Sequence, residues 1–234
     1  MIKIYDAMLK SARTPFTSGP HFLELKDKKQ IGDLEKMISQ LRTKKKIKIF
    51  NFTSCSEREG VSTVLANLVE HIQAQKTRNR ILLVDANFKR PSLHKMFNIN
   101  TEKGLADLLT GSASMTESIR PLDSPSGISV LCCGKGHAAL ADHISTEKIT
   151  AILREARNHF DSILVDSAPV LISGDAIATA TASDVTFLIV QSLKVPRQAA
   201  IRAIEQLNGD NNVVEGVILN KVQRVIPRWM QHLM

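Results

Sequence analysis

The chain has 234 residues, of which 43% are hydrophobic and 23% are charged. This length suffices for one domain with a sizeable core and a short extension, so stabilising disulfides are not required. The apolar runs are too short to cross a bilayer, and the first residues lack the apolar stretch and cleavage site of a secretory signal. The chain is therefore expected to be cytoplasmic.

The formal net charge is +8, which permits an acidic partner, anionic lipid or nucleic acid. Aromatic residues make up only 4%, so platforms for base stacking are not expected, and neither is a nucleic acid partner. Cys55, Cys132 and Cys133 lack metal-ligand spacing and are predicted to be small apolar fillers.

Residues 1–45 are predicted to form an N-terminal helical extension and linker. A short helix is expected at residues 4–13, followed by an irregular linker, because two prolines and a glycine interrupt regular structure there. Residues 31–43 carry apolar side chains at helical intervals, and the basic residues 44–46 read as the solvated end of that helix.

From residue 46 to residue 222, strand-like and helix-like segments alternate. Strands are expected at residues 47–54, 81–86, 127–133, 161–168, 184–190 and 213–219. Helices are expected at residues 62–76 and 147–159, near Ser92 and Leu105, and from Ile172 and Arg197. This alternation requires right-handed crossovers and predicts an α/β fold with a mostly parallel sheet and helices on both faces. Ligands of such folds bind at the carboxyl ends of the strands.

The first of these strands is followed by SCSEREGVST, in the place of a G-x-x-x-x-G-K-[ST] phosphate loop. Gly60 and Ser62 match that pattern. Cys55 stands at the first glycine, however, and Val61 stands at the lysine that would neutralise the phosphates. The helix N-terminus can still hold an anion. Ser62 and Thr63 could either ligate Mg²⁺ or cap the helix.

Two later strands end in aspartates, Asp85 and Asp166, which are expected to face the loop. Both are placed to orient a Mg²⁺-bound water, although an aspartate that closes a strand is also a common turn former or helix cap. Asn220 follows the last strand. The loop, the two aspartates and this asparagine together predict a P-loop NTPase-like domain over residues 46–222.

Long segments carry a family resemblance: LLVDANFKRPSLHKMF, GLADLLTG, DSILVDSAPVLISGDAIATATASDVTFLIV and GVILNKV. In them the chain resembles the bacterial tyrosine kinases of exopolysaccharide and capsule synthesis, within the larger class of deviant-Walker ATPases. The resemblance runs from Ile4 to Val222. It implies a role in binding Mg-ATP or Mg-ADP for six residues. They are the loop residues Gly60, Ser62 and Thr63, the Mg²⁺-water positions Asp85 and Asp166, and Asn220 near adenine.

The chain departs from the family pattern at positions that carry the chemistry. Val61 replaces the lysine, Glu57 and Arg58 replace a Pro-Gly pair, and Asn87 replaces an aspartate of the second motif. No catalytic residue set is therefore expected to be intact, the two strand-end aspartates would be vestigial or Mg²⁺-water positions, and nucleotide binding would be weakened or lost.

Self-assembly and autophosphorylation are in doubt for related reasons. The helix that resembles the family's subunit-contact motif keeps Arg42 but has Ser39 where an arginine is expected, so a homo-oligomer would be altered or lost. The only tyrosine is Tyr5, whereas the family carries a C-terminal tyrosine cluster. Residues 223–234, a C-terminal tail, could form a small amphipathic helix at a membrane surface or dock on the domain.

Three hypotheses for function follow. The first is a degenerate kinase-like adaptor or regulator of polysaccharide synthesis and export, held at the inner membrane by a membrane chain-length regulator or an active kinase paralogue. The second is an active ATPase or tyrosine kinase in which Arg58, Lys89 or Arg90 replaces the lysine. The third is a partitioning or division-site ATPase, which would explain the positive net charge and the amphipathic C-terminal tail.

Overall fold

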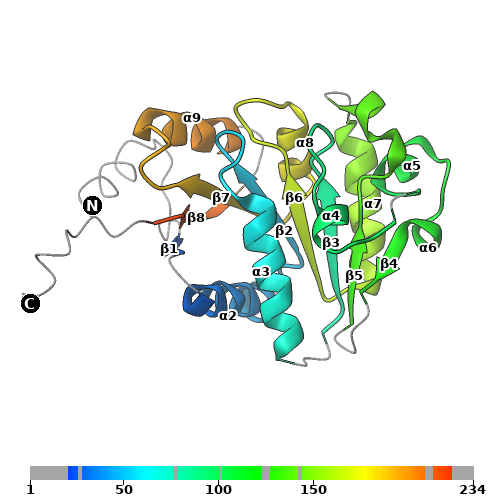
Figure 1. Cartoon of the computed structure of the whole chain (residues 1–234), viewed down its shortest axis with the longest axis horizontal. Coiled ribbons are helices and arrows are strands. Elements are labelled where there is room, and N and C mark those ends of the chain that lie inside the picture. Colours follow the sequence, from blue (N-terminus) through cyan, green and yellow to red (C-terminus); the bar gives the residue numbers. More distant parts are fainter. Residues whose placement is uncertain are drawn as a thin grey trace, which may run out of the picture.

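The computed structural model describes residues 21–25, 28–75, 79–100, 102–122, 127–141, 144–208 and 213–222. An eight-stranded sheet runs through the described part of the molecule in the order β1-β8-β7-β2-β6-β3-β5-β4 (Figure 1). The strands are β1 (His21–Glu24), β2 (Ile49–Ser54), β3 (Ile81–Ala86), β4 (Ile119–Pro121), β5 (Ile128–Leu131), β6 (Ser162–Ser167), β7 (Val185–Gln191) and β8 (Val214–Asn220).

Helices cover both faces of this sheet (Figure 1). They are α2 (Lys28–Lys45), α3 (Val61–Ala74), α4 (Leu93–Met96), α5 (Leu105–Thr110), α6 (Met115–Ser118), α7 (Thr146–His159), α8 (Asp175–Thr181), α9 (Arg197–Leu207) and the 3₁₀ helix η1 (Lys135–Leu140). All strand pairs are parallel except β4 with β5. The predicted α/β fold with a mostly parallel sheet and helices on both faces is confirmed. None of the described helices has the length and hydropathy to span a membrane.

The central strand β2 shows why the sheet is buried on both sides. All six of its residues are buried, which requires apolar or hydrogen-bonded side chains on each face. Phe50 and Phe52 pack in the cluster under α2 and α3, whereas Ile49 packs in the cluster under α5 and α7. Phe52 stacks on Phe187 of the neighbouring strand β7 with ring centroids 5.2 Å apart. This pairing fixes the register at the centre of the core.

The N-terminal part of the described chain packs onto the same core. The strand β1, in a segment that the sequence predicts to be an irregular linker, pairs in parallel with β8. That expectation was wrong because the partner of β1 lies almost 200 residues away along the chain. Leu34, Ile38 and Leu41 of α2 are buried against α3 and the sheet. The division of the chain at residues 45 and 222 stays a prediction, and residues 4–13, Tyr5 and the tail 223–234 lie outside the described residues.

Two element boundaries differ from expectation for local reasons. The helix expected from Ile172 begins at Asp175, because a turn opened by Pro169 comes first, with the Ser173 amide donating to the Pro169 carbonyl at 3.0 Å. The strand β5 ends at Leu131, because the carbonyls of the two following cysteines accept hydrogen bonds from the first amides of α5. The three-residue edge strand β4, which contains a proline, was not predicted.

Candidate functional site

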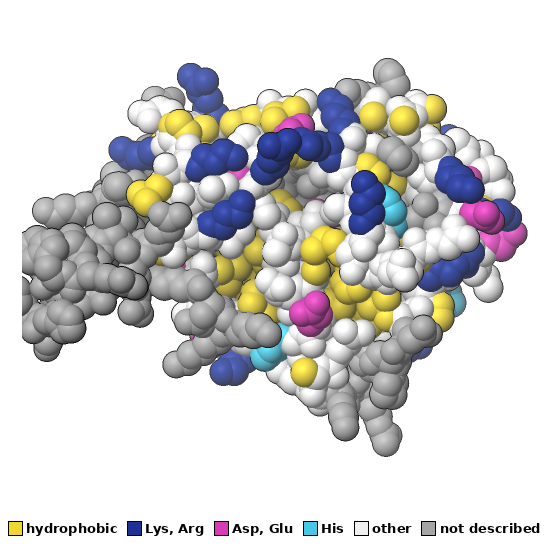
Figure 2. All heavy atoms as spheres, viewed as in Figure 1, with side chains coloured by type: hydrophobic (Ala, Val, Ile, Leu, Met, Phe, Trp, Pro, Cys, Tyr) yellow, Lys and Arg dark blue, Asp and Glu magenta, His cyan; other side chains and the backbone are white. Residues whose placement is uncertain are grey.

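A cavity of about 400 Å³ opens at the carboxyl ends of β2, β3 and β6. Its size lies within the usual range for small-molecule sites. Figure 2 shows Lys and Arg side chains gathered around the hollow. Most of the residues that line it are polar or charged, and the start of α3 contributes to the wall. The lining residues are Ser54, Glu57, Arg58, Glu59, Gly60, Val61, Ser62, Thr63, Asn87, Lys89, Arg90, Ser92, Met96, Ser167, Pro169, Ile172 and Lys221.

The loop before α3 keeps a backbone conformation that favours glycine at two positions. Gly60 has a φ of 98°, and a Cβ atom built there would lie 2.4 Å from Nδ2 of Asn220. Arg58 has a φ of 63°, in the left-handed region. The family resemblance places a glycine at this second position. The loop therefore holds its shape with a bulkier residue, at a conformational cost of about 1 kcal/mol.

Contacts with other elements explain how the loop keeps this shape. Four consecutive loop carbonyls each accept a side-chain hydrogen bond. The pairs are Ser54 Oγ to Ser56 O at 2.8 Å, Lys194 Nζ to Glu57 O at 3.3 Å, Lys221 Nζ to Arg58 O at 2.9 Å, and Asn220 Nδ2 to Glu59 O at 2.9 Å. Protein side chains thus organise the loop without a ligand.

Glu59 is a loop residue that the sequence reasoning did not single out. Its side chain is 1% exposed. Its carboxylate accepts from the Ser56 amide at 2.5 Å, the Ser56 hydroxyl at 2.7 Å and the Gln191 amide at 3.2 Å. A buried negative charge is tolerated there because these donors replace its water. Glu59 is therefore a structural brace of the loop.

Val61, at the position of the family's lysine, is the first residue of α3 and only 8% exposed. It belongs to the hydrophobic cluster that also contains Val64 and Leu65. The N-cap residue Gly60 offers no side-chain cap to the helix. The start of the helix thus presents an apolar side chain where phosphoryl transfer needs a cation.

The two predicted aspartates lie side by side, since Asp85 of β3 and Asp166 of β6 are direct partners in the parallel ladder. Both are fully buried. The Asp85 carboxylate accepts from the amides of Ser92 at 2.9 Å, Leu93 at 3.0 Å and Asn87 at 3.3 Å. These bonds partly offset the burial that raises its pKa. Asp85 is thus both a strand-end aspartate and the cap of the following turn.

Asp166 lacks comparable partners. Neither carboxylate oxygen has a hydrogen-bond partner of good geometry. Burial, and then the neighbouring charge of Asp85, raise the pKa of Asp166 well above its usual value, while the nearby Ser62 hydroxyl lowers it. Orphaned carboxylate oxygens beside a serine hydroxyl fit the hard oxygen ligands that Mg²⁺ takes beside a bound phosphate. Ser62, Asp85 and Asp166 would hold that ion, which would neutralise phosphate charge.

Groups of three or more histidine, cysteine or acidic side chains with metal-site spacing are not found in the described part of the chain. A Mg²⁺ ion in this cavity would therefore depend on ligand oxygens to complete its coordination.

Two predicted side chains are engaged with the protein itself. Asn87 accepts from the Arg90 amide through both its side-chain and backbone oxygens, which makes it a turn former. The Asn220 amide donates to the Glu59 carbonyl, and its oxygen accepts from the Lys221 amide at 2.9 Å. Thr63 is exposed at the cavity wall. The adenine-side role of Asn220 stays a prediction.

The prediction that the three cysteines are apolar fillers is confirmed, because each is buried in a hydrophobic cluster. Burial raises the pKa of Cys55 and of Cys132 to about 12, so their thiolates are disfavoured. Cys133 also has a polar contact, since its thiol donates to the Asp85 carbonyl at 3.0 Å. That contact gave no signal in the sequence.

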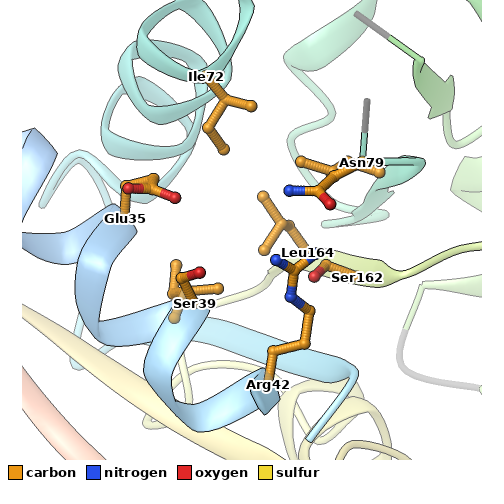
Figure 3. Close-up of a pocket in the computed structure, with 9 residues that line it drawn as sticks. Glu35, Ser39, Arg42, Ile72, Asn79, Ser162 and Leu164 are labelled. Carbon is orange, nitrogen blue, oxygen red and sulfur yellow. The ribbon is translucent and has the colours of Figure 1, made fainter. Parts of the chain in front are cut away.

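A second, much smaller cavity of about 20 Å³ lies between α2, α3 and the start of β6. Ser39 and Arg42, the two positions of the expected subunit-contact motif, both line it (Figure 3). Arg42 points from α2 toward Ser162 of β6 (Figure 3). The backbone amide of Arg80 is the main cause that lowers the pKa of Asp161, and the charge of Arg42 adds to it. Self-association through this helix stays a prediction.

Comparison with known proteins places this arrangement in a class. No family model matches the chain. The kinase domain of the Escherichia coli tyrosine kinase ETK has the same fold, with a TM-score of 0.76 and 20% identity over 86% of this chain and 77% of that one. The septum site-determining protein MinD of Pyrococcus horikoshii superposes with a TM-score of 0.65 and 20% identity over 80% of this chain and 77% of that one. Fold and loop therefore define a P-loop NTPase-like α/β protein.

Sequence relatives narrow this class to a family. The tyrosine-protein kinase ptk of Acinetobacter johnsonii is 32% identical over 165 residues, which is 70% of this chain but only 22% of that protein. The tyrosine-protein kinase CpsD of Streptococcus agalactiae is 28% identical over 215 residues, 88% of this chain and 93% of the relative. The chain belongs to the bacterial tyrosine kinase family of P-loop proteins.

Proposed function

We propose that this chain is a catalytically degenerate bacterial tyrosine kinase that acts as an adaptor or regulator in the synthesis and export of a cell-surface polysaccharide. The observation that carries the proposal is Val61. An apolar side chain in the core occupies the position of the lysine that stabilises the transferred phosphoryl group. Losing one preorganised charge of this kind typically costs about 100- to 1,000-fold in rate.

Other contacts support the same conclusion. Arg90 is ion-paired with Glu57, so part of its charge is already neutralised within the loop region. Asn87, in the place of a family aspartate, is an amide bound in a turn and cannot serve as a base. Mg-ATP or Mg-ADP would bind weakly or be lost, and phosphoryl transfer would be absent.

The adaptor role is proposed because the chain has the fold of the family but lacks the lysine of its phosphate loop. A membrane chain-length regulator or an active kinase paralogue would be the partner, and it would hold the chain at the cytoplasmic side of the inner membrane. A strain that lacks this gene is expected to lose or shorten its surface polysaccharide. Both the wild-type gene and a Ser62→Ala variant should restore the polymer, because the proposed role needs no phosphoryl transfer and Ser62, unlike Asp85, does not cap a turn. Restoration by the wild type alone would contradict it.

A binding experiment tests the loss of chemistry directly. Mg-ADP and Mg-ATP are titrated calorimetrically into the native protein and into a variant with Val61→Lys, Glu57→Pro and Arg58→Gly. The double variant with Glu57→Pro and Arg58→Gly alone is the matched control for loop shape. We expect the triple variant to bind at least tenfold more tightly than either other protein, because only it restores a lysine at the start of α3, beside the phosphate position.

Turnover separates the proposal from its main alternative. Phosphate release by the native protein that disappears in Asp85→Ala would establish an active ATPase or kinase with a substitute cation, and would overturn the proposal.

A further inference from the structure

The cavity retains positive charge despite the absence of the loop lysine. Four basic side chains line it: Arg58, Lys89, Arg90 and Lys221. They come from different parts of the chain, which the fold brings together in the cavity wall that also contains the start of α3. The surroundings of Arg90, Arg58 and Lys221 differ in ways that matter for binding an anion.

Arg90 is poorly suited to this role. Its guanidinium is ion-paired with the Glu57 carboxylate, and both side chains are about half exposed. An anion that recruits Arg90 would have to displace Glu57 or bind beside its negative charge. Arg58 is exposed, and its left-handed backbone places it at the bend of the loop.

Lys221 has a different environment. Its Nζ donates to the Arg58 carbonyl at 2.9 Å and to Oε1 of Gln191 at 3.4 Å. Both acceptors are neutral oxygens, so these bonds position the ammonium without cancelling its charge. The side chain also crosses the loop glycine, with Cε only 3.7 Å from the place of a Cβ atom on Gly60. The left-handed backbone of Lys221, with φ of 55°, and the bond from its amide to Asn220 fix this course.

We propose that Lys221 supplies the positive charge that is missing because Val61 replaces the loop lysine. The cavity would then bind a phosphate-bearing anion in contact with the Lys221 ammonium. The first backbone amides of α3 would donate hydrogen bonds to the same anion. Asp166 lies outside the cavity lining, but its buried carboxylate oxygens have no hydrogen-bond partner of good geometry, which suits a divalent cation that accompanies the phosphate beside Ser62 of the lining. Because Lys221 follows β8 and Val61 begins α3, Lys221 can hold an anion from a different part of the fold than the family's lysine does. This inference rests on the proposed function in that the site binds and does not transfer phosphate.

The probes for this site are inorganic diphosphate and ADP, each titrated with and without Mg²⁺ into the full chain. Four proteins are compared: wild type, Lys221→Gln, Lys221→Arg and Lys44→Gln. Lys44 is exposed at the end of α2, far from the cavity lining, so its variant removes the same charge without touching the site. We expect Lys221→Gln to weaken binding about tenfold, and the other two variants to stay within about threefold of wild type. Wild-type affinity should also fall more steeply with salt than that of Lys221→Gln.

Four other outcomes would each overturn the inference. No binding of either probe by the wild type would mean that the cavity holds no anion. Equal loss in Lys221→Gln and Lys221→Arg, with unchanged salt dependence, would mean that Lys221 only braces the loop. Equal affinity of Lys221→Gln and Lys44→Gln would mean that another side chain provides the charge. Tight binding of ADP but not of diphosphate would place recognition on the nucleoside. Phosphate release, measured on the same proteins, reports on the proposed function separately.

Discussion

Replacing Asp166 by asparagine is expected to stabilise the metal-free protein at about pH 8, although most substitutions of buried residues destabilise. Asp166 is fully buried, and its two oxygens have no hydrogen-bond partner of good geometry. It lies directly across the parallel ladder from Asp85, whose carboxylate is also fully buried. Asparagine keeps the shape of the side chain and removes the charge.

The magnitude follows from this geometry. Neighbouring strands are about 4.8 Å apart. Two like charges at about 5 Å and an effective dielectric constant of about 20 repel by about 3 kcal/mol. The pair can reduce this cost by taking up a proton, so we expect Asp166→Asn to raise the free energy of unfolding by about 1–3 kcal/mol at that pH.

The pH dependence has a definite sign. Burial and the Asp85 charge raise the pKa of Asp166 in the folded state above its unfolded value of about 3.9. Between those two pKa values the folded state binds more protons than the unfolded state, so stability falls as pH rises through this interval. Wild type should therefore be more stable at about pH 5.5 than at about pH 8 through this pair, and Asp166→Asn should lose much of that slope.

Urea unfolding in EDTA at the two pH values measures both effects. Asp33→Asn is the matched control, because it removes an exposed acid of α2. Mg²⁺ added in excess over the EDTA together with diphosphate should raise the unfolding midpoint of the wild type at the higher pH and leave that of Asp166→Asn nearly unchanged. If Asp166→Asn is less stable than wild type in EDTA at about pH 8, the reasoning about a buried carboxylate pair is refuted.

Three further substitutions test the loop and the core. Gly60→Ala should destabilise by about 1–3 kcal/mol, because a Cβ atom would meet Asn220 and φ is positive there; urea unfolding measures it, and a change below about 0.5 kcal/mol would contradict the loop geometry. Leu34→Ala should cost about 2–5 kcal/mol, against near zero for the exposed Gln40→Ala, and equal effects would mean that α2 is not part of the core. Val61→Lys alone should destabilise by about 1–2 kcal/mol, since it buries a cation at a helix N-terminus, and thermal unfolding should show the loss recovered by Mg-ADP.

Much of the fold could be predicted because its signals are local. The buried strands β2, β3, β6, β7 and β8 are short apolar runs, and helices with one apolar face separate them. The order of connection then requires a parallel sheet, whose carboxyl edge gathers whatever follows each strand. For this reason Gly60, Ser62, Asp85 and Asp166 could be assigned to one region from the sequence alone. The strand β1 could not, because four residues gain strand structure only by pairing with β8.

The sequence by itself determined the fold class, the family resemblance and the loss of the loop lysine, since each depends on residue types at fixed spacings along the chain. The tertiary structure alone decided which charges remain usable at the cavity. Arg90 is paired with Glu57, whereas the Nζ of Lys221 donates to two neutral oxygens, and the Asp166 carboxylate beside Asp85 has no hydrogen-bond partner of good geometry. Such differences arise from side chains that are distant in sequence and close in space, and electrostatic interactions depend on distance and burial, which no spacing along the chain records.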